Sequence, residues 1–354
     1  MPSAGFVPCQ RMDGIISAWG KILRGIKPNL SIELTRECPL RCPGCYAYGD
    51  HHLEGDVTLR SLADFKGDDL VARVKALVER HDPLHLSIIG GEPLVRYREL
   101  GEILPWLAAR GVYVNLVTSA VRPIPLAWAG LNRLLIAVSI DGLQPEHDAR
   151  RTPATYDRIL KHIAGHQVTV HCTVTRQQAQ RPGYLEEFVR FWSAQAATRR
   201  IWFSLYTPQA GEVSDERLGE EDRKRVAAEI LALGPRYPKL EASKRMVLEG
   251  LLEPPESPDE CIFARTTHCL SADLQTVVTP CQLGGTPECS ECGCLAASAL
   301  TAVGRYRLPG GIPVSRMLDW SEAVGRHVGS VRSFVRPKTR AGQARTIPVR
   351  AVTD

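Results

Sequence analysis

Two kinds of segment, which differ in the spacing of their apolar residues, take turns along this 354-residue chain. Continuous apolar runs of four to eight residues are typical of buried strands, and apolar residues spaced three or four apart are typical of helices packed on one face. Strand-like runs occupy residues 30–35, 84–90, 112–118, 134–140, 168–174 and 200–206. Helix-like runs occupy 65–80, 97–110, 154–165 and 184–197, whereas 122–130 is short and rich in proline.

Strands that alternate with helices indicate parallel βα units joined by right-handed crossovers. Six such units are too few for a closed eight-stranded barrel. The pattern therefore predicts an α/β fold in which residues 29–210 form an open, partial (β/α)6 barrel of the TIM type.

The flanking segments follow other patterns. We expect an amphipathic helix within 1–28, a helical connector over 211–256, a small cysteine-rich extension over 257–300 and a C-terminal segment with a basic tail over 301–354. Prolines and acids mark 251–260 as a linker, and 270–281 is typical of a short hairpin. The N-terminal helix could pack on the barrel or lie on a membrane.

Charge and hydropathy limit the location. No apolar run approaches the roughly 20 residues of a membrane span, and the N-terminus lacks a signal-peptide pattern. We therefore expect a cytoplasmic protein. Seven basic residues and no acid lie between Arg326 and Arg350, whereas the whole chain carries +5. This tail is either solvated or in contact with an anionic membrane surface, and nothing predicts nucleic-acid binding.

The eleven cysteines are clustered. Three form a C-x3-C-x2-C run, six lie in the extension, and only Cys9 and Cys172 stand alone, the latter as a small buried residue of a strand. Clustered cysteines in a cytosolic chain indicate metal rather than disulfides. The two groups are Cys38, Cys42 and Cys45, and then Cys261, Cys269, Cys281, Cys289, Cys292 and Cys294.

Polar groups follow several predicted strands directly. The first cysteine group follows the first strand, "GGEP" at 90–93 follows the second, and "TSA" at 118–120 and "SIDG" at 139–142 follow later ones. Because the carboxyl ends of parallel strands share one rim, these groups should converge there.

The C-x3-C-x2-C run followed by Tyr46, together with "GGEP" and the partial barrel, resembles the radical S-adenosylmethionine (SAM) superfamily over roughly residues 28–210. The resemblance implies that three thiolates hold a [4Fe-4S] cluster with one open iron site, which SAM fills. Reductive cleavage of SAM would then give a 5′-deoxyadenosyl radical that modifies an unactivated substrate. A low-potential donor, flavodoxin or ferredoxin, would supply the electron.

The same resemblance implies a set of SAM contacts. Gly90, Gly91 and Glu92 would meet the methionine amino group, Ser139 or Asp141 the ribose or methionyl part, Arg150 the carboxylate and Tyr46 the adenine; Pro93 and Ser119 complete the set. The alternative is a structural zinc site, in which His51 or His52 joins the three cysteines.

The second cysteine group resembles, in divergent form, the SPASM and twitch extensions of radical SAM enzymes. Six cysteines suffice for one auxiliary [4Fe-4S] cluster but not for two fully ligated ones, and a zinc ribbon is the alternative. Cys281, Cys289 and Cys292 are the first choice of ligands.

Three substrate classes compete. A lipid or isoprenoid is placed first, because the N-terminal amphipathic stretch 11–27, "SIELTRECPL" at 31–40 and "VTVHCTV" at 168–174 resemble adenosyl-transferring enzymes of hopanoid synthesis. A peptide, as in radical SAM maturases, and a small metabolite or nucleoside follow. Tyr206 and Gln209, which end the sixth strand, are predicted to line the substrate pocket. A non-catalytic iron–sulfur or zinc protein is the hypothesis of another class.

Overall fold

The computed structural model describes residues 16–49, 52–53 and 57–335, the side chains of 329–335 excepted. Seven parallel strands form one sheet in the order β6-β5-β4-β3-β2-β1-β7. Their bounds are β1 Asn29–Glu33, β2 His85–Ile89, β3 Tyr113–Thr118, β4 Leu134–Ser139, β5 Val168–Val174, β6 Thr198–Leu205 and β7 Thr267–Leu270. The α/β prediction and all six predicted strands are confirmed.

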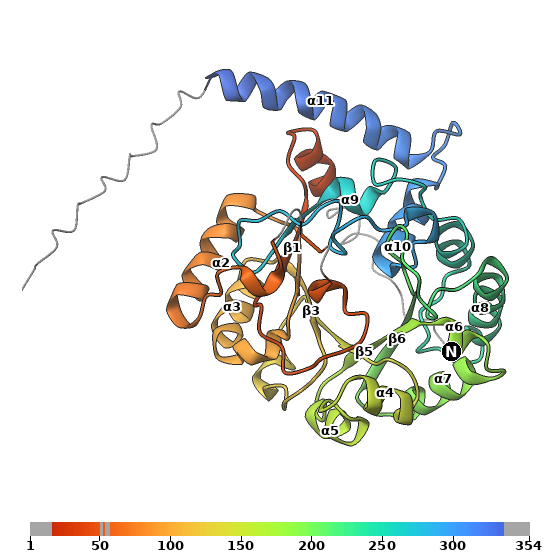
Figure 1. Ribbon diagram of the computed structural model, residues 1–354. Helices are drawn as coiled ribbons and strands as arrows, with labels where there is room; N and C mark the ends of the chain where they lie inside the picture. The colour runs from red at the N-terminus through yellow and green to blue at the C-terminus, as the bar shows by residue number, and fades with distance from the viewer. Residues whose placement is uncertain (1–15, 50–51, 54–56, 336–354) are drawn as a thin grey trace, which may run out of the picture.

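Helices surround this curved sheet, and α11 lies farthest from it (Figure 1). They are α2 Gly67–His81, α3 Tyr97–Ala109, α4 Gln144–Arg150, α5 Tyr156–His162, α6 Arg176–Ala179, α7 Tyr184–Ala194, α8 Glu220–Leu233, α9 Ile262–Thr266, α10 Leu295–Gly304 and α11 Val314–Val335. Short 3-10 turns span Tyr46–Tyr48, Leu59–Ser61, Pro93–Arg96, Leu126–Trp128 and Cys289–Glu291, and a π-helical turn, η5, spans Met246–Leu251. The proline-rich stretch 122–130 thus holds only one short turn.

The two faces of the sheet differ in polarity. Ile32 pairs in register with Ile88, and Ile88 with Leu116, and all three are fully buried in the main apolar core. The alternate positions carry small polar side chains, since Ser31 pairs with Ser87. Successive strand residues point to opposite faces, so the outer face packs on helices and the inner face of the barrel is polar.

The seventh strand was not predicted as part of the barrel. Residues Leu270 and Val277 form an antiparallel bridge, which confirms the predicted hairpin. Its first arm, β7, also pairs in parallel with β1, with Ser31 opposite Cys269. Four residues are too few to show a strand period in the sequence, so the link between the extension and the barrel was visible only in the fold.

The N-terminal helix is described over residues 16–22 and packs on the body of the protein. Trp19 Nε1 donates to Ser321 Oγ of α11 at 2.8 Å, and a Cβ on Gly25 would lie 2.8 Å from the Gly325 carbonyl oxygen. None of the described helices is both long and apolar enough to cross a membrane. The basic tail beyond residue 335, Cys9 and the start of the predicted helix lie outside the described residues.

Candidate active site and auxiliary cysteine cavity

The loop after β1 carries the first three cysteines and is anchored by charged groups. Glu37 accepts hydrogen bonds from Arg96 Nη1 at 2.9 Å and Lys66 Nζ at 2.5 Å, and these lower the pKa of its carboxyl to about 2. Arg96, which is nearly buried, also reaches Asp64 at 2.5 Å. The start of the loop is therefore fixed relative to the end of β2.

The glycines of "GGEP" let this loop pack against the end of β2. Gly90 and Gly91 have φ of +76° and +45°. A Cβ would lie 2.3 Å from Glu33 Cβ at the first position and 2.4 Å from the Glu37 carbonyl oxygen at the second. The Glu92 amide donates to that same oxygen at 2.8 Å. Only glycine allows this approach, so the two motifs form one joined rim.

The Glu92 side chain ties the ends of β2 and β3 together. Its carboxylate is buried and accepts from Leu94 N at 2.9 Å, Thr118 Oγ1 at 2.5 Å and Ser119 N at 2.7 Å. Burial raises the pKa of Glu92, and the three hydrogen bonds oppose that rise. Pro93 is buried at the start of the following 3-10 turn. The carboxylate is thus committed to the protein framework.

Two adjacent arginines at the end of α4 occupy different places. Arg151 donates to Asp141 Oδ2 at 2.7 Å and to Ser119 Oγ at 2.8 Å. Arg150 forms an ion pair with Asp141 at 3.1 Å and donates to the Pro43 carbonyl at 2.8 Å and to Glu216 at 3.0 Å. Burial alone would lower the pKa of Arg151, but Asp141 and then Cys42 raise it well above its ordinary value.

Arg150 was the residue predicted for SAM, and the fold places Arg151 next to two other predicted contacts. The "RR" pair at 150–151 was the sequence signal for this second candidate, but only the fold separates the two side chains. Ser139, at the end of β4, pairs in register with His171.

Cys38, Cys42 and Cys45 are free and half-buried. Burial raises the pKa of Cys38 to about 11, and it raises the pKa of Cys42 against the effect of Arg151. Three thiols beside the partly buried guanidinium of Arg151 form a donor set suited to a negatively charged iron–sulfur cluster. Among the described residues, no three Cys, His, Asp or Glu side chains are arranged to hold a single metal ion.

His52 is engaged elsewhere. Its Nε2 lies 2.7 Å from Glu33 Oε1 and its Nδ1 lies 3.0 Å from the Leu283 carbonyl oxygen. Glu33 also accepts from Ser271 Oγ, beyond β7. Both ring nitrogens are used, which argues against His52 as a zinc ligand, and His51 lies outside the described residues. The Tyr46 ring packs edge-on to His52 at 5.6 Å.

The His52 contacts join the first cysteine loop to the second cysteine segment. Leu283 follows Cys281 by two residues, and a Cβ on Gly284 would lie 2.0 Å from the His52 carbonyl oxygen. The buried Glu33–His52 pair is therefore a brace between the two candidate cluster sites. Histidine and glutamate lie in different elements, so sequence spacing gave no signal for the pair.

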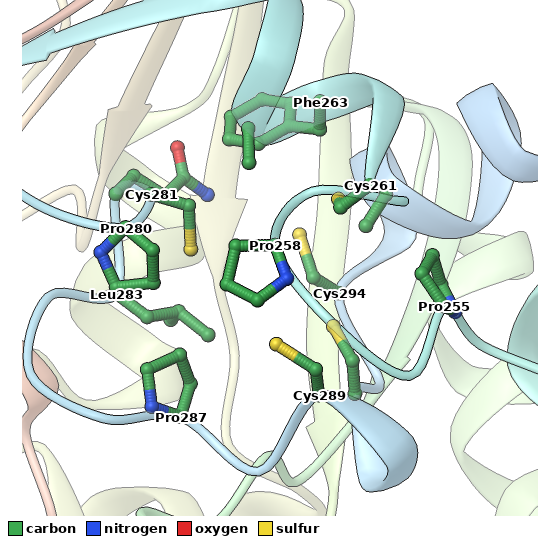
Figure 2. A pocket seen from close by; sticks show the side chains of 14 residues that line it. Pro255, Pro258, Cys261, Phe263, Pro280, Cys281, Leu283, Pro287, Cys289 and Cys294 are labelled. Carbon is green, nitrogen blue, oxygen red and sulfur yellow. The ribbon is translucent and has the colours of Figure 1, made fainter.

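Five of the six later cysteines line one largely apolar cavity, where Cys281, Cys289 and Cys294 point toward the space beside Pro258 (Figure 2). The five are Cys261, Cys281, Cys289, Cys292 and Cys294. Cys269 does not line the cavity; it is buried on β7. Of the six predicted ligands, the fold thus brings five together.

Burial governs the state of these thiols. It raises the pKa of Cys292 to about 12, and it also raises the pKa of Cys281 and Cys294. Metal binding would therefore have to displace thiol protons. Convergent thiols in an apolar, partly enclosed cavity fit an iron–sulfur cluster.

The cavity segment is bonded to the end of β6. Leu205 N donates to the Gly293 carbonyl at 3.0 Å and Gly293 N to Thr207 Oγ1 at 2.9 Å. A Cβ on Gly293 would lie 2.1 Å from the Leu205 carbonyl oxygen. Gln209 Oε1 accepts from Thr286 N at 2.8 Å, and the Tyr206 hydroxyl donates to Glu212. The two predicted substrate residues thus lie in the loop that joins the barrel mouth to the cavity.

His171 is a further candidate that the sequence reading missed. His171 lies on β5, in register with Ser139 of β4 and on the same face of the strand as Thr173. Its Nε2 lies 2.8 Å from Ser204 Oγ. Burial, aided by Arg151, lowers the pKa of His171 to about 4. A neutral imidazole therefore lies on the inner wall. The signal was a histidine inside the strand "VTVHCTV".

Residues 32–174 match the family model of the radical SAM superfamily. The chain is 31% identical over 181 residues to the PqqA peptide cyclase of Methylocella silvestris, covering 47% of this chain and 44% of the relative. It is 36% identical over 118 residues to the PqqA peptide cyclase of Rhodopseudomonas palustris, covering 32% and 29%.

Solved structures share the fold. SuiB of Streptococcus suis bound to the precursor peptide SuiA gives a TM-score of 0.54 at 15% identity, covering 82% of this chain and 68% of that one. SuiB bound to S-adenosylmethionine gives 0.50 at 15% identity, covering 77% and 64%.

Residues 32–174 therefore carry a radical SAM domain, as the cysteine loop and barrel predicted. A [4Fe-4S] cluster and SAM are the cofactors of such a domain. The chain spans less than half the length of the two peptide cyclases it matches.

Proposed function

We propose that this protein is a radical SAM enzyme that modifies a peptide and uses one auxiliary iron–sulfur cluster. The observation that carries the proposal is the placement of two cysteine sites at one barrel mouth. The three-cysteine loop follows β1, and the five-cysteine cavity is bonded to the end of β6. A substrate at the mouth would lie between them.

Cys38, Cys42 and Cys45 would hold the first cluster and leave one iron open for SAM. When bound, the cluster and SAM supply one-electron reductive chemistry that ends in abstraction of a hydrogen atom from the substrate. Of the cavity cysteines, Cys281, Cys289 and Cys292 remain our first choice as auxiliary ligands. Cys261 and Cys294 compete for the fourth position, and Cys269 is the weakest candidate because it does not line the cavity.

The protein framework would bind and orient SAM. Arg151 supplies a fixed cation for a carboxylate, and Asp141 and Ser119 hold its guanidinium in place. Glu92 is saturated by three donors, so the "GGEP" segment would offer backbone groups, while Ser139 and Tyr46 would face the ribose and the adenine. Arg150 would hold the loop through the Pro43 carbonyl.

A peptide substrate has more support than the lipid that the sequence placed first. The two relatives are named peptide cyclases, and one structural neighbour is titled as bound to a precursor peptide. The inner wall of the barrel is polar, since Ser31, Ser87 and Asn115 pair in register across β1, β2 and β3. Such groups suit the amides of a peptide better than an isoprenoid chain.

Neutral His171, paired with Ser204, could accept a proton from the substrate. A flavodoxin or ferredoxin would be the electron donor. Contact of the basic tail with a membrane remains a separate proposal, which the comparisons do not support.

The test is a substrate competition under anaerobic conditions. The reconstituted protein, SAM and dithionite would be incubated with peptides encoded beside its gene or with a membrane lipid extract, and products analysed by mass spectrometry. A mass change in a peptide, absent in the Cys38→Ala, Cys42→Ala, Cys45→Ala variant, is expected. A modified lipid with unchanged peptides would overturn the proposal.

A further inference from the structure

A buried arginine of α8, Arg223, hydrogen-bonds to the segment that carries Cys289 and Cys292 of the cavity. Arg223 is 7% exposed. Its guanidinium donates to the backbone carbonyl oxygens of Glu291 at 2.9 Å, Cys292 at 3.1 Å and Leu251 at 2.6 Å. The Cys289–Glu291 turn brings two cavity cysteines to this point. The positive charge of Arg223 is therefore fixed against the backbone of Cys292, one of the cavity cysteines.

This charge has no carboxylate partner among the described residues. Asp222, its neighbour in α8, pairs with Arg225, and the Glu291 carboxylate pairs with Arg217 at 2.8 Å. Burial lowers the pKa of Arg223, opposed by the charges of Cys292 and then Glu291. Carbonyl dipoles offset only part of the cost of a buried cation. The cavity thiols, once deprotonated by metal, are the nearby groups that can supply the missing negative charge.

We propose that Arg223 is a positioning residue for the auxiliary cluster, which it holds by its carbonyl contacts and whose reduced state it stabilises by its charge. The inference rests on the proposed function, since it requires a cluster in the cavity. Each cluster reduction adds one electron and one negative charge, and the reduction potential depends on nearby charge and solvent exposure. A buried cation acts strongly because little water screens it.

Arg217 provides a matched control on the same turn. It binds the Glu291 side chain, whereas Arg223 binds the Glu291 backbone. The Arg217 side chain is 40% exposed and its charge is balanced within the pair. Solvent screens such a pair, so it should affect the cluster weakly.

The experiment measures a potential. The full chain with Cys38, Cys42 and Cys45 changed to Ala would be reconstituted with iron and sulfide, so that only the cavity can hold a cluster. Electron paramagnetic resonance would then follow a potentiometric titration in this parent and in its Arg223→Gln, Arg223→Lys and Arg217→Gln variants. Gln keeps hydrogen-bond donors but loses the charge, whereas Lys keeps the charge.

In Arg223→Gln the ratio of reduced to oxidised cluster at a fixed potential should fall at least tenfold, a shift of about 59 mV for one electron. In Arg223→Lys and in Arg217→Gln this ratio should stay within about threefold of the parent. Loss of the cluster in Arg223→Gln alone would equally support the proposal, because only that variant removes the balancing charge.

The proposal would be overturned if the ratio of reduced to oxidised cluster in Arg223→Gln stayed within threefold of the parent at the same potential. Cluster loss in both Arg223→Gln and Arg223→Lys would also overturn it. A parent that binds zinc, or no iron–sulfur cluster, would overturn the auxiliary cluster itself and the role of Arg223 with it. That failure appears in the parent alone, so the two failures are distinguishable.

Discussion

Replacing His52 with alanine should destabilise the protein far more than most single substitutions. The side chains of His52 and Glu33 are 0% and 2% exposed. Removing one partner of a buried pair strands the other charge and costs about 3–5 kcal/mol. The lost bond to the Leu283 carbonyl adds about 1 kcal/mol. We expect a total loss of about 4–6 kcal/mol, a large share of a typical stability of about 5–15 kcal/mol.

Urea unfolding of the metal-free protein, followed by tryptophan fluorescence, would measure this loss. The Glu33→Gln, His52→Ala double variant is the matched control, because it removes the stranded carboxylate. It should be more stable than His52→Ala alone by at least about 1 kcal/mol. A loss below about 1 kcal/mol in His52→Ala would refute the brace, and a double variant with strictly additive losses would refute the coupling between its two members.

Three further outcomes are expected. Gly91→Ala should weaken iron retention, because its Cβ would lie 2.4 Å from the Glu37 carbonyl oxygen. The control Gly101→Ala, which has open space around its Cβ in α3, should retain iron normally. Equal iron content in both variants would contradict the packing of the cysteine loop against the end of β2. Burial tends to lower the pKa of His52, but the bond to Glu33 raises it overall. The stabilisation by the protonated His52 is therefore complete below its unfolded pKa of about 6.5 and is lost as pH rises through its folded pKa. The difference in unfolding free energy between wild type and His52→Ala should thus shrink above neutral pH. A difference that grows with pH would contradict a raised pKa at His52. Arg151→Gln should weaken SAM binding about tenfold, measured by equilibrium dialysis, and more than Arg150→Gln; the reverse order would restore Arg150 as the carboxylate ligand.

The elements that the sequence predicted well are those with a local signal. The buried faces of parallel strands are continuous apolar runs, so residues such as Ile32 and Ile88 marked their strands. The C-x3-C-x2-C spacing marked the first candidate site for the same reason, since its three cysteines lie within eight residues of sequence.

The features that were missed depend on contacts between distant segments. β7 is too short to show a period, and its partner β1 lies over 230 residues away. Arg150 and Arg151 are adjacent, so only the direction of the α4 helix decides which one meets Ser119. His52 contacts Glu33 and Leu283 only in the tertiary fold. Which five of the six later cysteines line the cavity, and that Cys269 does not, is likewise decided by the folded segment.

The central claim is that the three-cysteine loop supports reductive cleavage of SAM. The reconstituted protein would be reduced anaerobically with dithionite, given SAM, and assayed for 5′-deoxyadenosine beside the Cys38→Ala, Cys42→Ala, Cys45→Ala variant. The account predicts 5′-deoxyadenosine from the wild type and none from the variant. Equal amounts from both, or a wild type that binds zinc tightly and makes none, would contradict it.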